Sequence, residues 1–138
     1  MICVNNCENE IDMNIETSLL QIVEPADINR RMADGDTFVV NLVAAWCPDC
    51  TVRQKPYIDG FAQKMKAHDI DVLQVNVQLL RGDFISDEHH QLTDQFGGHG
   101  YPRTVLIHNG TAVDKNNVEI IAEDTLSELA RKFIQIIA

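Results

Sequence analysis

Two cysteines separated by two residues are the side chains of this chain best suited to chemistry. Cys47 and Cys50 come directly after an apolar run from Phe38 to Ala45, which predicts a buried strand. Pro48 lies where a helix would begin, a favoured place because the N–H that proline lacks would be unpaired there. Side chains three positions apart in a helix have Cβ atoms about 5–6 Å apart, which small adjustments bring into disulfide range. The spacing therefore predicts a thiol pair that makes and breaks one local disulfide.

The two cysteines are predicted to have different roles. Cys47, at the start of the helix, faces unpaired backbone N–H groups and the positive end of the helix, and both favour a thiolate. A thiolate attacks a disulfide to form a mixed disulfide, which Cys50, more buried and one turn further on, would then resolve. Asp49 stabilises the helix start but repels a negative sulfur nearby, and we expect these two effects nearly to cancel. The pair is therefore predicted to reduce disulfides rather than to act as a strong oxidant.

A second segment reinforces this interpretation. Gly100-Tyr101-Pro102-Arg103 opens an apolar strand that runs to Ile107 and on into His108-Asn109-Gly110. This segment, together with Trp46-Cys47-Pro48-Asp49-Cys50 after a buried strand, resembles the thioredoxin superfamily over about Leu20 to Ile137. The resemblance implies an α/β fold, a thioredoxin-like three-layer α/β/α sandwich with a central mixed sheet.

The resemblance also implies roles for individual residues. It makes Cys47 and Cys50 the catalytic pair and predicts a cis peptide bond between Tyr101 and Pro102. In the family this bond places backbone beside the disulfide, where an extended substrate can pair with it. The implied substrate-binding residues are Gly100, Tyr101 and Pro102, and the implied supporting residues are Trp46, Pro48, Asp49 and Asn41.

Three departures from the family pattern bear on function. Thioredoxins often place a buried Asp behind the cysteine pair, with a lysine nearby, whereas this chain has Asn41 and Gln74. We expect these two to form a neutral hydrogen-bonded pair, which cannot accept the proton of Cys50. Arg103 is large and charged, and we expect it to favour acidic substrates. The stretch from Gln78 to His90 is longer than the family pattern, and is either surface elaboration or a loop that recognises partners.

The remaining pattern predicts alternating strands and helices around this site. The helix after the cysteines is expected to run to about Ala67, with a kink at Pro56 in its interior. Thr125-x-x-Glu128 resembles a capping box at the start of the last helix. The other predicted elements are an edge strand at Leu19–Val23, a helix from Glu24-Pro25 to Asp34, a strand at Ile70–Val77, a helix from Ser86 or Asp87 to Phe96, and strands at Arg103–His108 and Ala112–Ile121. We expect one domain at residues 17–138, preceded by a polar extension at 1–16.

Composition narrows the function classes. The 138 residues carry a net charge of −10, which argues against binding nucleic acid or an anionic membrane surface. Arg30 is the first basic residue, so no secretory leader is evident, and no apolar run approaches the ~18 residues of a membrane span. We therefore expect a cytoplasmic protein. The thiol–disulfide chemistry that the resemblance implies needs no tightly bound cofactor. The expected partners of the protein are a protein or small-molecule disulfide and a separate thiol reductant or reductase.

Other interpretations of the same residues remain open. Cys3 and Cys7 have a spacing that zinc tolerates, so they and the Cys47–Cys50 pair could form one zinc site, although incidental thiols or an auxiliary redox couple are alternatives. The run Asp87-Glu88-His89-His90 contains metal-ligating types, but solvated helix-start residues explain it better, and we predict no metal. The alternative to a disulfide reductase is a non-catalytic binding, chaperone-like or redox-sensing module that keeps the fold.

Overall fold

The strand β2, Phe38–Ala44, is the centre of the molecule and is buried along its whole length. In the computed structural model, which describes residues 19–138, β2 pairs in parallel with β3 (Asp71–Leu80) and antiparallel with β5 (Arg103–His108). A strand buried on both faces needs apolar residues at successive positions, which explains the apolar run in the sequence, interrupted only by Asn41.

The full sheet is open and mixed, in the order β1-β3-β2-β5-β6. The edge strands are β1 (Leu20–Ile22) and β6 (Thr111–Val118), and the short β4 (Asp83–Phe84) pairs with the end of β3. Asn109 and Gly110 join β5 to β6 in a two-residue turn with φ of 52° and 82°, the positive values that a tight hairpin turn requires. A Cβ atom at Gly110 would collide with the carbonyl oxygen of Met32, so glycine in this turn allows the hairpin to approach the helix at Pro25–Ala33.

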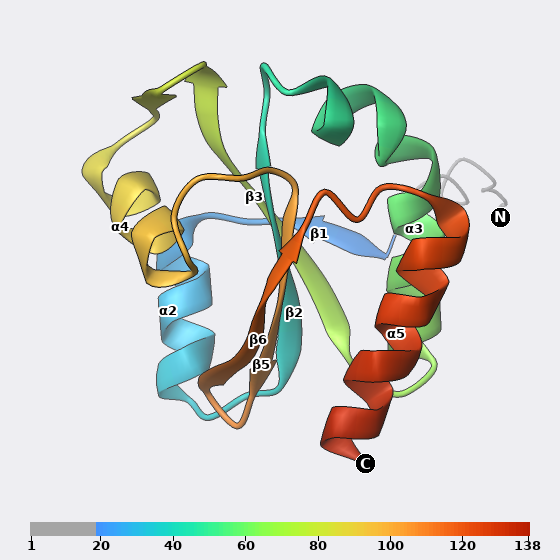
Figure 1. Cartoon of the computed structure of the whole chain (residues 1–138). Coiled ribbons are helices and arrows are strands. Elements are labelled where there is room, and N and C mark those ends of the chain that lie inside the picture. Colours follow the sequence, from blue (N-terminus) through green and yellow to red (C-terminus); the bar gives the residue numbers. More distant parts are fainter. Residues whose placement is uncertain (1–18) are drawn as a thin grey trace, which may run out of the picture.

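Helices cover both faces of the sheet (Figure 1). Helices α2 (Pro25–Ala33) and α4 (Asp87–Gln95) lie on one face, and α3 (Lys55–Lys66) and α5 (Glu123–Ile137) lie on the other. Two separate cores result, because alternate side chains of β2 point to opposite faces: Val40 packs in one and Val39 in the other. The predicted three-layer α/β/α sandwich is confirmed.

Several predicted element boundaries shift in the structure. Strand β3 continues past Val77 to Leu80, and with β4 it turns the start of the expected insertion into a hairpin. Ser86 caps α4, as predicted, and its hydroxyl accepts a hydrogen bond from the His89 N–H at 3.4 Å. The capping box expected at Thr125 and Glu128 is wrong, because the N-cap of α5 is Ala122, three residues before Thr125, and the helix begins at Glu123. The Thr125 hydroxyl accepts from the Ala122 N–H instead.

The helix after the cysteines also differs from the prediction. It is divided into a π-helical turn, η2 (Asp49–Arg53), and the α-helix α3, with Gln54 between them. The Gln54 N–H donates to the carbonyl of Asp49 at 2.9 Å, a π-type bond across five residues. Pro56 thus lies in the first turn of α3, where its missing N–H leaves no helical bond unmade, rather than in a helix interior.

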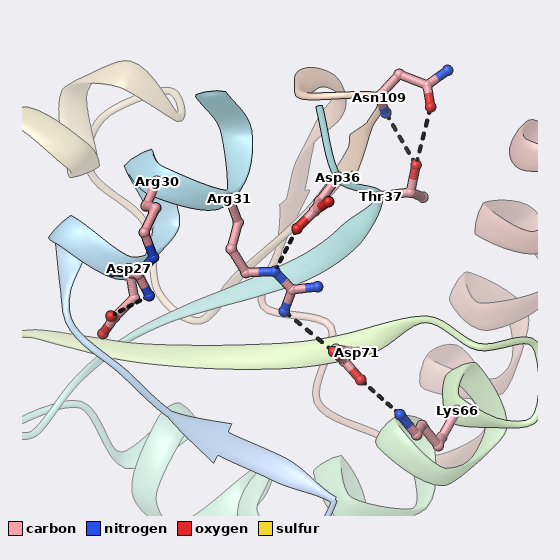
Figure 2. A network of polar contacts seen from close by, with 8 residues as sticks. All are labelled: Asp27, Arg30, Arg31, Asp36, Thr37, Lys66, Asp71 and Asn109. Carbon is pink, nitrogen blue, oxygen red and sulfur yellow. Dashed lines mark hydrogen bonds and ion pairs between the residues drawn. The ribbon is translucent and has the colours of Figure 1, made fainter. Parts of the chain in front are cut away.

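A network of charged side chains ties three elements together away from the cysteines (Figure 2). Arg31 of α2 donates to Asp36 at 3.1 Å and to Asp71 of β3 at 3.2 Å. The second oxygen of Asp71 accepts from Lys66, at the end of α3, at 2.9 Å. This network links α2 on one face of the sheet to α3 on the other through the first residue of β3.

No helix within residues 19–138 is long and apolar enough to cross a bilayer. The polar extension predicted at 1–16, with Cys3 and Cys7, lies outside the described residues, so the domain boundary stays a prediction.

Candidate active site

The chain passes from β2 into a turn that presents the two cysteines. The Cys47 N–H donates to the carbonyl of Ala44 at 3.0 Å, which fixes the turn at the end of the strand. The Cys47 carbonyl then accepts from the N–H groups of Cys50 and Thr51, each at 3.0 Å, which starts the helical turn. Cys47 therefore lies immediately before the first helical residues, as its predicted place at a helix start requires. Both sulfurs are thiols in the structure, and each cysteine is 7% exposed, so the expectation that Cys50 is the more buried residue was wrong.

The surroundings of the two sulfurs differ. Burial raises the pKa of Cys50 far above its ordinary value, and the neighbouring Cys47 and Asp49 raise it further against one opposing hydrogen bond to Ala44. Cys50 is therefore a neutral thiol at physiological pH. Cys47 instead opens onto a surface groove.

The segment before β5 lies against Cys47. The peptide bond between Tyr101 and Pro102 is cis, and the thiol of Cys47 lies 3.7 Å from the Tyr101 carbonyl oxygen. The rings of Trp46 and Tyr101 meet edge to face, with centroids 6.2 Å apart. Gly100 has a φ of +118°, and a Cβ atom there would crowd Val118, so this approach depends on glycine. Two segments about fifty residues apart in sequence thus form one site.

A groove of about 500 Å³ runs along this site. It contains most of the residues that the family resemblance singled out: Trp46, Cys47, Pro48, Asp49, Gly100 and Tyr101. Cys50, Asn41 and the buried Pro102 do not line the groove. The groove also takes in residues that the sequence did not single out as a group: Arg53, Gln78, Arg81, Gly82, His99 and Glu119.

Cys50 instead lines a second groove, of about 430 Å³, on the other side of the pair. Lys55, Asp59 and Asn76 lie in the same groove, so solvent reaches the neighbourhood of Cys50 from that side. The side-chain oxygen of Asn76 is buried there, and within residues 19–138 nothing donates a hydrogen bond to it. A buried acceptor of this kind is ordinarily satisfied by an ordered water.

The position behind the pair holds a network of amides. Asn41 is fully buried, and its Nδ2 donates to Gln54 at 2.8 Å and to Gln74 at 3.0 Å. Its Oδ1 accepts from the Thr104 hydroxyl at 3.0 Å, and Gln54 also donates to the Ile120 carbonyl at 3.0 Å. The predicted neutral pair of Asn41 and Gln74 is therefore present as part of a larger network. Sequence reasoning missed Gln54, because its partner Ile120 lies 66 positions away.

Arg103 does not act as expected. The sequence suggested that it would favour acidic substrates, but it is 5% exposed and donates inward to the carbonyls of His99 and Lys115, each at 2.8 Å. Burial lowers the pKa of its guanidinium. Arg103 therefore links the loop before β5 to strand β6 through hydrogen bonds. The expectation was wrong because nothing in the sequence around Arg103 indicated that its side chain would be buried.

No group of three or more His, Cys, Asp or Glu side chains in the described part of the chain is arranged to hold a metal ion. In the run at 87–90, His89 contacts Ser86 at 2.7 Å and Glu24 at 3.1 Å, which joins α4 to the start of α2. Its contacts are those of a side chain that holds two helices together.

The family model for thioredoxin matches residues 20–132. The chain belongs to the thioredoxin family. The match covers every element from β1 into α5, and therefore both segments of the candidate active site. Among curated proteins, none matches the chain.

Solved thioredoxins share the fold at low sequence identity. Thioredoxin from Fasciola hepatica superimposes with a TM-score of 0.61 at 20% identity, over 82% of this chain and 98% of that one. Chlamydomonas reinhardtii thioredoxin f2 gives a TM-score of 0.62 at 18% identity, over 82% and 94%. Mitochondrial thioredoxin 3 from Saccharomyces cerevisiae gives 0.61 at 16%, over 82% and 94%. Family membership and the adjacent cysteines support thiol–disulfide oxidoreductase chemistry in general.

Proposed function

We propose that this thioredoxin-family protein reduces protein disulfides through a Cys47–Cys50 dithiol cycle. One observation carries the proposal: Cys47 opens onto a groove beside the Tyr101 carbonyl, whereas Cys50 lies away from that groove. A pair in which Cys47 lines the groove beside the Tyr101 carbonyl and Cys50 does not suits a two-step exchange, in which the first thiol meets the substrate and the second releases it.

In the first step, the thiolate of Cys47 attacks one sulfur of a substrate disulfide in the groove. The substrate S–S bond breaks, a bond forms between Cys47 and that sulfur, and the other sulfur leaves as a thiolate and takes up a proton. The Tyr101 carbonyl faces the reacting sulfur and accepts a backbone N–H of an extended substrate, while Trp46 and Pro48 form the apolar wall around it.

In the second step, Cys50 loses its proton and attacks the sulfur of Cys47. The mixed disulfide breaks, the substrate leaves with its second thiol, and the enzyme holds the Cys47–Cys50 disulfide. Asn41 is an amide and takes no proton, so we assign the acceptor to water in the second groove. Because burial raises the pKa of Cys50, this step is expected to accelerate as the pH rises.

A separate dithiol reductant or reductase returns the enzyme disulfide to two thiols, and the two electrons pass to the next substrate. The cycle therefore needs no tightly bound cofactor, because the sulfurs themselves carry the electrons.

The test is insulin reduction with dithiothreitol as electron source, combined with a trap. The wild-type protein is expected to accelerate reduction, and Cys50→Ser is expected to accumulate a mixed disulfide with insulin. Cys47→Ser is the matched control, since it keeps the fold and one thiol but lacks the attacking sulfur. If neither turnover nor a mixed disulfide appears in a folded protein, the chain is a binding or redox-sensing module that keeps the fold.

A further inference from the structure

The β3–β4 hairpin, residues 78–84, forms one wall of the groove that contains Cys47. Gln78, Arg81 and Gly82 all line this groove together with Trp46. The hairpin lies at the same end of the sheet as the helical turn that carries the cysteines (Figure 1). The part of the chain that departs from the family pattern is therefore beside the reacting sulfur.

The side-chain amide of Gln78 has only one orientation that its neighbours allow. Its Oε1 lies 2.8 Å from the indole Nε1 of Trp46 and 2.9 Å from the backbone N of Gly82. Both neighbours are donors, so the oxygen must face them and the NH₂ group must point the other way. The Nε2 atom is buried, and within the described residues it has no acceptor. Gln78 therefore positions Trp46 against the turn of the hairpin, because its oxygen accepts from both the indole and the Gly82 N–H.

Arg81 supplies a positive charge at the same wall. Its guanidinium lies over the Trp46 ring, 5.2 Å from the ring centroid. No ion pair within residues 19–138 includes Arg81. The other arginine of the groove, Arg53, is already paired with Asp49 at 2.8 Å. Arg81 is thus the arginine of this groove whose charge remains available for a substrate.

The opposite charge lies elsewhere in the groove. Glu119 lines it from the segment after β6, and its N–H donates to the Pro102 carbonyl at 2.8 Å. A substrate carboxylate is therefore attracted toward the hairpin and repelled from Glu119. With Arg81 and Glu119 at different places along the groove, an acidic extended substrate is favoured in one direction across Cys47.

We propose that the β3–β4 hairpin selects substrates with a carboxylate beside the disulfide, which Arg81, over the Trp46 ring, binds. This proposal rests on the proposed reductase function and names the substrate class of the same groove: extended, acidic, disulfide-bearing segments. The whole chain carries a net charge of −10 and repels acidic partners at long range. At physiological salt the screening length is about 8 Å, so the contacts at the hairpin decide the selection.

The experiment uses short peptides closed by an internal disulfide, identical except for Asp, Asn or Lys placed before or after the attacked cysteine. The rate of mixed-disulfide formation is measured with Cys50→Ser at physiological salt. For one of the two placements, the Asp peptide is expected to react about fivefold faster than the Lys peptide, the size of effect that a partly exposed charge contact gives.

Two variants in the Cys50→Ser background test Arg81. Arg81→Glu is expected to reverse the preference. Arg81→Gln keeps a long polar side chain beside Trp46 but removes the charge, and is expected to abolish the preference. Arg30→Glu, a surface change of the same charge on α2, is the matched control and is expected to leave the preference unchanged.

The outcomes separate this proposal from the proposed function. Reaction with every peptide at equal rates, or an Asp preference that survives Arg81→Glu or Arg81→Gln, overturns the hairpin proposal and leaves the reductase intact. If no peptide forms a mixed disulfide while insulin does, the site does not take short extended segments and the hairpin proposal is wrong. If neither insulin nor any peptide reacts, the reductase function itself is wrong.

Discussion

At the scale of single residues, Asn41 shows how this chain departs from the thioredoxin pattern that it resembles. An amide satisfies both sides of the buried position, because Nδ2 donates to two glutamine oxygens while Oδ1 accepts from the Thr104 hydroxyl. A carboxylate is an acceptor only, and would face the oxygens of Gln54 and Gln74 without a proton to share. The surrounding glutamines therefore suit asparagine and oppose the aspartate that thioredoxins often have there.

Replacing Asn41 by aspartate is expected to destabilise the protein in a pH-dependent way. The change removes two hydrogen bonds and buries a charge, so the free energy of unfolding at pH 7 should fall by about 3 kcal/mol. The introduced carboxyl should have a raised pKa in the folded state, so the loss should shrink as the pH falls toward 4, where it is protonated. Urea unfolding at both pH values measures the effect.

Asn109→Asp is the matched control, because it makes the same chemical change in the exposed turn between β5 and β6. It is expected to alter the free energy of unfolding by less than about 0.5 kcal/mol. An Asn41→Asp protein as stable as the wild type at pH 7 would show that the amide network matters little to stability.

The sequence alone predicted the reactive cysteines better than the buried polar residues around them. Cys47, Cys50 and the pairing of Asn41 with Gln74 followed from spacing and from the family pattern. Gln54 and Gln78 did not, because a lone glutamine gives no signal of burial. Each is buried through contacts with residues far along the chain, Ile120 for Gln54 and Trp46 for Gln78.

At the scale of elements, Pro56 accounts for the way the helix after the cysteines is divided. The sequence predicted one helix kinked at Pro56, but the structure has a π-helical turn, a break at Gln54 and a new helix. The extra residue of the π-helical turn lets Pro56 fall in the first turn of α3. It also leaves Gln54 buried, where its side chain can reach Asn41. Such a turn adds one residue to a helix and has no simple sequence signature.

The hydrogen bonds of Asp71, which connect α2, β3 and α3, predict that the free energy of unfolding falls at acid pH. Burial alone raises the pKa of Asp71, but the hydrogen bond and charge of Lys66, with those of Arg31, outweigh it and hold the pKa below its ordinary value. A lowered folded-state pKa stabilises the protein above the unfolded-state value of about 3.9, and this contribution is lost as pH falls through the folded-state value. Asp71→Asn should therefore lower the free energy of unfolding by about 1 kcal/mol at pH 7 and by much less near pH 3.

Urea titrations of Asp71→Asn at the two pH values test this. Asp34→Asn, at an exposed position at the end of α2, controls for the change in net charge. If Asp71→Asn lowers the free energy of unfolding by the same amount at pH 7 and pH 3, the loss comes from packing rather than from the charge of Asp71.

At the scale of the whole molecule, the family resemblance predicted the sandwich and the order of its elements, but not how the longer stretch after β3 folds. A strand that continues to Leu80 and turns back through β4 is indistinguishable in sequence from a strand that ends at Val77 and enters a loop. The difference depends on pairing with the rest of the sheet and on the contact of Gln78 with Trp46. The same pairing places the hairpin beside Cys47.

The two cores are expected to unfold together, because β2 contributes side chains to both. Leu92 of α4 packs in the core that contains Val40, and Met65 of α3 packs in the core that contains Val39. Leu92→Ala and Met65→Ala should each lower the free energy of unfolding by about 3 kcal/mol, the usual result of emptying a buried site. Exposed Ile136→Ala should change it by about 0.5 kcal/mol or less. In each variant, far-UV circular dichroism and Trp46 fluorescence should report one coincident urea transition.

A Met65→Ala protein whose helical circular dichroism falls at a lower urea concentration than its Trp46 fluorescence changes would contradict this. It would mean that the α3–α5 layer separates from the sheet on its own, and that the site does not depend on that layer.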